Sequence, residues 1–142
     1  MAIITELSER PQWIEAFSVM KQLRPHLTEA LFLNLVEEMH HSGYTMFGLY
    51  DHSRLEAVIG FTITTNLYYG KHVWVYDLVT EERSRGKGYG YELLSFVEAF
   101  AVHNNCECLA LSSGVQRYDT HRFYTKKMNY KEVSKVFKKD FG

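Results

Sequence analysis

The segment RSRGKGYG, residues 83–90, is a glycine-rich, basic turn between two segments with the patterns of regular secondary structure. It holds three glycines and three cationic side chains, after a strand-like segment (HVWVYDLVT, residues 72–80) and before a helix-like one (YELLSFVEAFAVH, residues 91–103). A turn from strand to helix exposes the first N–H groups of the helix, and these attract anions. Glycines permit positive φ and remove Cβ atoms that would keep an anion away. We therefore predict that residues 85–90 cradle an anion such as a pyrophosphate.

Two common nucleotide motifs do not fit this turn. A Walker loop requires G-x-x-x-x-G-K-[ST], which the sequence lacks. A dinucleotide fingerprint requires G-x-G-x-x-G near the first strand, whereas Gly86 and Gly88 are followed by Tyr91 at the third position, past the middle of the chain. A tight helix entry with solvated arginines is the remaining alternative. The alternation of glycine with basic residues favours the anion site over it.

The composition is that of a soluble globular protein. The chain has 142 residues, 46% hydrophobic and 23% charged, so we predict one domain over residues 1–142. A net charge of -1 argues against a nucleic-acid binder, although a basic turn and a lysine-rich tail keep a nucleic-acid-binding α+β domain as an alternative. No apolar run approaches the roughly 20 residues that span a membrane, and the N-terminus is too short and too charged for a signal peptide.

The only two cysteines, Cys106 and Cys108, lie two residues apart in strand-like sequence. A disulfide between them would be strained, and a zinc site would need further ligands at suitable spacing. We therefore expect free thiols, no metal site and a reducing, cytoplasmic location.

The hydrophobic periodicity predicts an α+β fold with the element order β-α-α-β-β-β-α-β-α-β. Pro11 suits the first turn of the first helix, Thr28 the N-cap of the second, and Gly43 its end. A central mixed, mostly antiparallel sheet of about six strands is expected, with helices on both faces. Its strands are predicted at residues 2–7, 44–51, 55–70, 72–80, 106–113 and 129–141, with a turn at 51–54 and a short helix at 118–128. The last strand is expected at a solvent-exposed edge, because its lysines alternate with apolar residues.

The residues around the turn are similar to those of a known family. RGKGYG, residues 85–90, matches the R/Q-x-x-G-x-G/A motif of the GNAT acyltransferase superfamily. Residues 76–94 resemble its strand four, pyrophosphate loop and helix three, and residues 109–130 resemble its strand five, helix four and the turn to strand six. The resemblance covers nearly the whole chain, since the element order also agrees.

The resemblance implies an N-acetyltransferase that uses acetyl-CoA as cosubstrate and a primary amine as acceptor, in direct attack within a ternary complex. The backbone of Leu78 and Val79 would pair with the pantetheine arm, and Tyr124 would protonate the departing thiolate. The pyrophosphate would be held by the backbone N–H groups of Arg85, Gly86, Lys87, Gly88, Tyr89 and Gly90. Independently of the resemblance, a phenol with a pKa near 10 is protonated at neutral pH and can donate a proton to a thiolate.

One departure from the family pattern lies beside Tyr124. The family reads F-Y-x-x-x-G-F, whereas this chain reads FYTKKMNY, with one more residue before the aromatic and Asn129 in place of glycine. Because asparagine tolerates the left-handed conformation, we expect the turn to be kept. His121, in the same short helix, could contact the coenzyme or the acceptor, or be a plain helix residue.

The sequence does not identify which residue deprotonates the amine. Asp77 is the first candidate, Glu81 and Glu82 are the others, and the family also acts without a single base. The acceptor could be a small molecule or a peptide, and a homodimer is possible. The same fold could also serve as a non-catalytic module that binds CoA or acyl-CoA.

Overall fold

The computed structural model describes residues 2–142, in two compact units. The first unit ends at Ala110 and the second is Leu111–Gly142. The units are described separately below, and the single domain over residues 1–142 stays a prediction.

The first unit contains three helices, a short 3-10 turn and a sheet. The helices are α1 (Arg10–Leu23), α2 (Glu29–His41) and α3 (Tyr89–His103), and the 3-10 turn is η1 (Glu82–Ser84). The strands are β1 (Ala2–Glu6), β2 (Thr45–Asp51), β3 (Arg54–Asn66), β4 (Gly70–Thr80) and β5 (Cys108–Leu111), whose last residue begins the second unit. The predicted α+β class and the predicted order are confirmed as far as the short helix after β5.

The helix boundaries follow the sequence signals. The Thr28 side chain accepts a 3.2 Å hydrogen bond from the backbone N–H of Leu31, which makes it the N-cap of α2. Pro11 lies in the first turn of α1, where its missing N–H costs no hydrogen bond. Local chemistry therefore explains where both helices begin.

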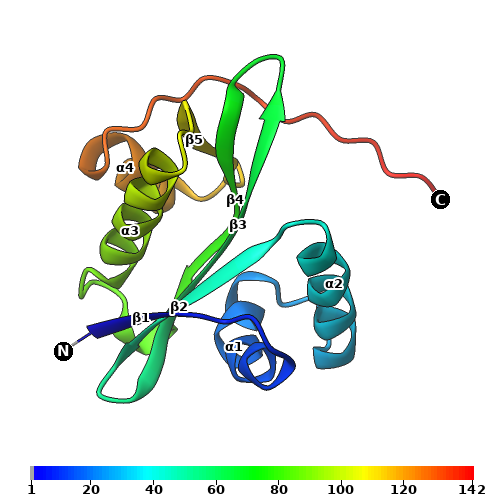
Figure 1. The fold of residues 1–142 in the computed structure, drawn as a ribbon, viewed down its shortest axis with the longest axis vertical. Coiled ribbons are helices and arrows are strands. Elements are labelled where there is room, and N and C mark those ends of the chain that lie inside the picture. The colour runs from blue at the N-terminus through cyan, green and yellow to red at the C-terminus, as the bar shows by residue number, and fades with distance from the viewer. Residues whose placement is uncertain (1) are drawn as a thin grey trace. The chain divides into compact units, whose positions relative to one another are not determined.

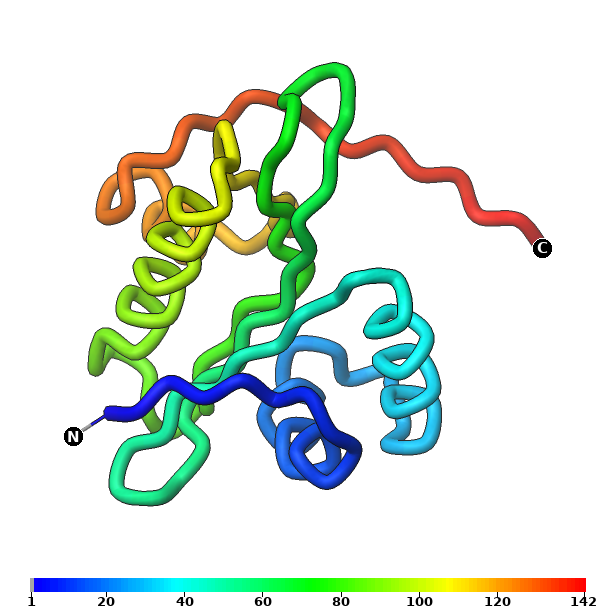
Figure 2. Tube along the Cα trace, viewed as in Figure 1, coloured from blue at the N-terminus to red at the C-terminus, as the bar shows by residue number. Residues whose placement is uncertain are grey.

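The five strands lie in the sheet in the order of the sequence. β1, β2, β3 and β4 pair antiparallel, and β5 lies beside β4 in a mixed sheet. The turn between β2 and β3 places His52 and Ser53 at φ of 52° and 65°, as in a two-residue hairpin turn. Figure 2 shows the chain reversing there. The predicted turn at residues 51–54 is thereby confirmed.

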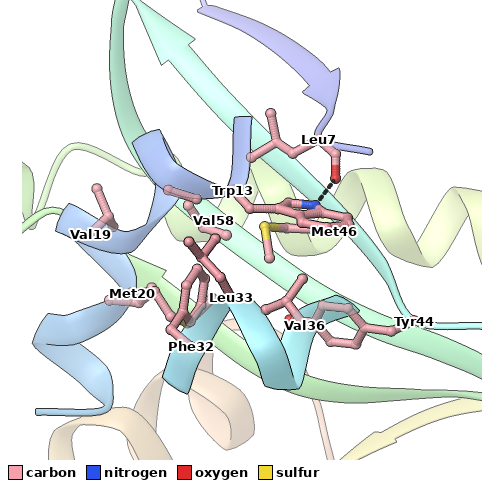
Figure 3. Packing of buried hydrophobic residues seen from close by; sticks show 12 residues of the cluster. Leu7, Trp13, Val19, Met20, Phe32, Leu33, Val36, Tyr44, Met46 and Val58 are labelled. Atoms are coloured by element: carbon pink, nitrogen blue, oxygen red, sulfur yellow. Dashed lines mark hydrogen bonds between the residues drawn. The ribbon is translucent and has the colours of Figure 1, made fainter. Parts of the chain in front are cut away.

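Helices cover both faces of the sheet, as Figure 1 shows for α3 on one side and α1 with α2 on the other. Toward α1 and α2, the sheet contributes Met46, Val58 and Val79 to one buried cluster (Figure 3). In this cluster the indole N–H of Trp13 donates a 2.8 Å hydrogen bond to the carbonyl of Leu7, which satisfies its polar atom inside the core.

The opposite face of the sheet is aromatic. Phe47, next to Met46 in β2, stacks on Phe61 of β3 at 6.1 Å between ring centroids, and the ring of Phe96 in α3 lies 5.0 Å from that of Phe47. Adjacent strand residues point to opposite faces, so β2 supplies one core with Met46 and the other with Phe47.

The sixth strand predicted at residues 129–141 is wrong for the described structure. In residues 2–142 the sheet has five strands, and residues 129–142 belong to no helix or strand. Alternating residues define which side chains would share a face, but only a hydrogen-bonded neighbour makes an extended segment a strand.

Candidate active site

The predicted anion loop joins β4 to α3 through η1. Gly86 and Gly88 adopt φ of +86° and +85°, and Gly88 is the N-cap of α3. A Cβ added to either glycine would meet nothing within 4 Å, so positive φ rather than crowding requires glycine here. The first N–H groups of α3 have no acceptor within the helix. The loop therefore offers bare backbone and a helix N-terminus, which is the geometry that a pyrophosphate needs.

Two hydrogen bonds to carboxylates anchor this loop. The Tyr89 hydroxyl donates to Oδ2 of Asp51 at 2.6 Å, and the Ser84 hydroxyl donates to Oε1 of the buried Glu56 at 2.8 Å. The bond to Asp51 raises the pKa of Tyr89 to about 12, and the same bond lowers the pKa of Asp51. The side chain of Tyr89 thus serves the fold, while its backbone N–H belongs to the predicted cradle.

Glu81 organises the beginning of the loop. Its carboxylate accepts a 2.8 Å hydrogen bond from the backbone N–H of Arg83 and a 3.1 Å bond from the Gln22 amide. Gln22, in α1, also accepts a 2.8 Å bond from the N–H of Glu82. The hydrogen bond from the Arg83 N–H, and next that from the Gln22 amide, lower the pKa of Glu81. Glu81, a candidate base in the sequence, is therefore engaged in holding the turn.

β4 carries a bulge just before the loop. Gly60 pairs with Asp77, but Phe61 pairs with Val75, so Tyr76 is the extra residue. A bulge bends its strand and interrupts the ladder at this point. Tyr76 lies two residues before Leu78, the first of the two residues predicted to hold the pantetheine arm.

The end of β4 extends past its neighbour β5. The N–H of Glu107 donates to the carbonyl of Lys71, so β5 begins beside the beginning of β4. β5 has only four residues, whereas β4 has eleven. Leu78, half-buried, and Val79, buried in the core, lie on the part of β4 beyond this short neighbour. A backbone partner could add there as an extra strand.

Asp77 lies on the face of the sheet that α1 and α2 cover, the same face as Val79. Its Oδ1 accepts a 3.0 Å hydrogen bond from Nε of Arg24, and its Oδ2 accepts a 2.9 Å bond from the hydroxyl of Tyr44. The Asp77 side chain is only 14% exposed. Both carboxylate oxygens of the candidate base are thus already engaged.

Sequence patterns assigned no functional role to Arg24, Tyr44 or Gly60. The pair Tyr44 and Asp77 is 33 residues apart in sequence and the pair Arg24 and Asp77 is 53 apart, so no local pattern joins them. One local signal was present: Gly60 interrupts a strongly β-prone run, and glycine inside a strand often marks a bulge or a close approach.

The second unit contains Tyr124, in a π-helical turn. α4 (Tyr118–Arg122) continues into η2 (Phe123–Lys127), where the N–H of Met128 bonds to the carbonyl of Phe123, five residues back. Asn129 then adopts φ of 62° and the N–H of Tyr130 bonds to the carbonyl of Tyr124. The widened turn absorbs the extra residue of FYTKKMNY, and Asn129 takes the left-handed conformation as expected.

Burial raises the pKa of Tyr124, with Arg117 opposing that shift. The phenol therefore keeps its proton through the neutral range. Nε2 of His121 lies 2.7 Å from the carbonyl oxygen of Gly114, so this nitrogen is engaged within the unit. Arg122 forms an ion pair with Asp119.

The sequence-predicted site residues are divided between the units. The first unit brings the loop, Leu78, Val79 and Asp77 onto one continuous segment of strand, turn and helix, residues 77–90. Tyr124 belongs to the second unit. Within residues 2–142, no three His, Cys, Asp or Glu side chains gather as metal ligands would, and no helix has the length and apolarity to cross a membrane.

The fold is mixed α+β, with a turn of positive-φ glycines between a bulged strand and a helix. The chain belongs to the acetyltransferase (GNAT) family, whose model matches residues 8–130. It is 34% identical over 140 residues to YhdJ of Bacillus subtilis (strain 168), described as an uncharacterized N-acetyltransferase, covering 98% of this chain and 99% of that protein.

Solved structures share the fold. A transcriptional regulator from Bacillus halodurans C-125 has a TM-score of 0.83 at 18% identity, over 99% of this chain and all (100%) of that one. The aminoglycoside N-acetyltransferase AAC(6')-Iy, in complex with the bisubstrate analog CoA-S-monomethyl-acetylneamine, has a TM-score of 0.86 at 13% identity, over 100% of this chain and 99% of that one.

Proposed function

We propose that the protein transfers an acetyl group from acetyl-CoA to a primary amine, by direct attack in a ternary complex. The loop carries the proposal, since Gly86 and Gly88 hold positive φ at the N-terminus of α3 with open space around them. Family membership, and a structural neighbour in complex with a CoA conjugate, support the same donor.

In this proposal each part of the chain has one task. The backbone N–H groups of residues 85–90 bind the pyrophosphate, with charge from Arg85 and Lys87. The backbone of Leu78 and Val79 aligns the pantetheine arm as an added strand. As the amine nitrogen bonds to the acetyl carbon and the carbon–sulfur bond breaks, Tyr124 gives its proton to the thiolate sulfur.

Asp77 is the proposed acceptor of the amine proton. A carboxylate oxygen can accept more than one hydrogen bond, so Oδ2 can receive a proton through a water while Tyr44 remains bound. Replacing Asp77 by asparagine removes this capacity and should lower kcat. A variant with undiminished kcat would exclude Asp77 as the base.

A second candidate function is a non-catalytic CoA-binding module. One observation favours it: both oxygens of Asp77 already accept hydrogen bonds, as expected of a carboxylate that holds the fold. Such a module would bind CoA through the same loop, and its affinity would not depend on Tyr124.

Two measurements test the function. Isothermal titration should show micromolar-range binding of acetyl-CoA, and the absence of binding would exclude both candidates. A thiol-release assay with small amines, polyamines and peptides should then show turnover with at least one acceptor. Binding without turnover across the panel favours the module. A steeply salt-dependent affinity for oligonucleotides would contradict the prediction that nucleic acid is not a partner.

Two further predictions describe the protein outside its chemistry. Light scattering of the purified chain should report whether it is a homodimer. Fractionation of cells that express it should recover the protein with the cytoplasm.

A further inference from the structure

The hydroxyl of Tyr44 occupies the space where any side chain at position 60 would begin. A Cβ added to Gly60 would lie 1.7 Å from Oη of Tyr44 and 2.3 Å from its Cζ. Gly60 pairs with Asp77 across the β3–β4 ladder. The buried phenol therefore lies across these two strands at the bulge, and glycine at position 60 is what permits it.

Three separate parts of the chain meet at this point. Arg24, the C-cap of α1, donates from Nε to Oδ1 of Asp77 and from its Nη2 to the carbonyl of Tyr76, at 3.0 and 2.9 Å. Tyr44, just before β2, donates to Oδ2 of Asp77 at 2.9 Å. Arg24 thus binds both Asp77 and the extra residue of the bulge, Tyr76, while Tyr44 hydrogen-bonds Asp77.

Hydrogen bonds, and not only van der Waals packing, define the cluster of Tyr44, Arg24 and Asp77. A phenylalanine at position 44 would fill nearly the same volume, so the buried hydroxyl is explained by its bond to Asp77. Burial and then the Asp77 charge raise the pKa of Tyr44 well above its usual value, with Arg24 opposing and Tyr76 adding to the shift. The Tyr44 hydroxyl therefore stays protonated at neutral pH and donates to the Asp77 carboxylate.

We propose that Tyr44 is a positioning residue for acetyl transfer. Its hydroxyl holds the Asp77 carboxylate, in concert with Arg24, and thereby holds the bulged end of β4 that leads into Leu78 and Val79. The proposal rests on the proposed function, and Tyr44 acts through Asp77 rather than on the substrates themselves.

Tyr44→Phe tests the proposal, with Tyr50→Phe as the matched control. Tyr50 also donates to a carboxylate, Glu15 of α1, at 2.6 Å, but it lies at the irregularity of the β2–β3 ladder and not at the bulge in β4. Tyr44→Phe should lower kcat about tenfold or more, as loss of a hydrogen bond to a charged group implies. The affinity for CoA should fall by less than kcat does, because the loop proposed to bind the pyrophosphate has its own anchors in Asp51 and Glu56. Tyr50→Phe should leave both constants unchanged.

A double-mutant cycle tests whether Tyr44 acts through Asp77. If it does, the Tyr44→Phe/Asp77→Asn double variant should turn over no more slowly than Asp77→Asn alone. Multiplicative losses, or equal kcat in Tyr44→Phe and Tyr50→Phe, would overturn the inference. If the wild-type protein acetylates no amine at all, the proposed function fails instead, and the two results are distinct.

Gly60→Ala gives an independent variant that leaves Tyr44 itself unchanged. The new methyl group would displace the phenol, so kcat should fall as in Tyr44→Phe. Gly48→Ala is the control. Its Cβ would meet side-chain atoms of Leu55 and Leu7 at 2.7 and 3.0 Å, and none of Tyr44, Arg24 or Asp77 is among these neighbours. Equal kcat in the two glycine variants would count against the inference, and Tyr44→Phe decides it if Gly60→Ala does not fold.

Discussion

The hydroxyl of Tyr89, the first residue of α3, donates a 2.6 Å hydrogen bond to Asp51, the last residue of β2. The bond fixes the N-terminus of α3 against the sheet, next to the two positive-φ glycines. The conformation of the loop therefore depends on a hydrogen bond to a residue outside it, Asp51.

Tyr89→Phe should consequently lower the melting temperature by a few degrees and weaken CoA binding severalfold. The aromatic ring still packs, so only the anchor is lost. Tyr68→Phe, at the exposed tip of the β3–β4 hairpin, is the control and should change neither quantity. Equal CoA affinities of wild type and Tyr89→Phe in isothermal titration would show that the loop does not need this anchor.

Gly88→Ala should weaken CoA binding at least tenfold. The φ of +85° strains an L-residue by about 1–2 kcal/mol, and the added methyl group would occupy the open space that the pyrophosphate is proposed to fill. Gly43→Ala carries the same backbone strain at φ of +104°, in the turn after α2, and has no part in the loop. Both variants should lose similar free energy of unfolding, but only Gly88→Ala should lose affinity. Equal affinity losses would mean that strain alone is responsible.

Local signals predicted most of the fold. Thr28, Pro11 and the turn at residues 51–54 act through their immediate neighbours, so the sequence places them correctly. The prediction of a strand at residues 129–141 was wrong because the alternation of side chains there is equally local. A strand requires a hydrogen-bonded partner, which the alternation does not specify.

In the candidate site, too, the sequence predicts the local features and misses those that depend on distant contacts. The glycine loop is a contiguous segment, and its left-handed glycines follow from the sequence. The cluster of Tyr44, Gly60, Arg24 and Asp77 depends on strand register and on a bulge. A bulge shifts the pairing by one residue, and neither hydrophobic period nor turn composition marked its position in β4.

Tyr124→Phe should reduce kcat by about a hundredfold or more and leave CoA affinity unchanged, since the phenol is proposed as a proton donor only. Because burial raises its pKa above the ordinary value near 10, the phenol stays protonated through about pH 9. Loss of the Tyr124 proton should therefore cause no fall in the wild-type kcat between pH 7 and about pH 9. Any fall in this range should also be present in Tyr124→Phe. A fall that is absent from Tyr124→Phe would assign the lost proton to Tyr124 and contradict the raised pKa.

Glu81 should make folding stability depend on acid pH. Its pKa is lowered in the folded chain, chiefly by the Arg83 N–H, so it favours the folded state above its ordinary pKa of about 4.3. That stabilisation is lost as pH falls below this value and through the lower folded pKa. In urea unfolding, the stability difference between wild type and Glu81→Gln should be largest near neutral pH and should shrink toward about pH 3. Glu37→Gln, an exposed carboxylate on α2 that lies 3.7 Å from Arg10, is the control and should follow the wild-type curve closely. A difference for Glu81→Gln that stays constant from neutral to acid pH would show that its hydrogen bonds do not favour the charged form.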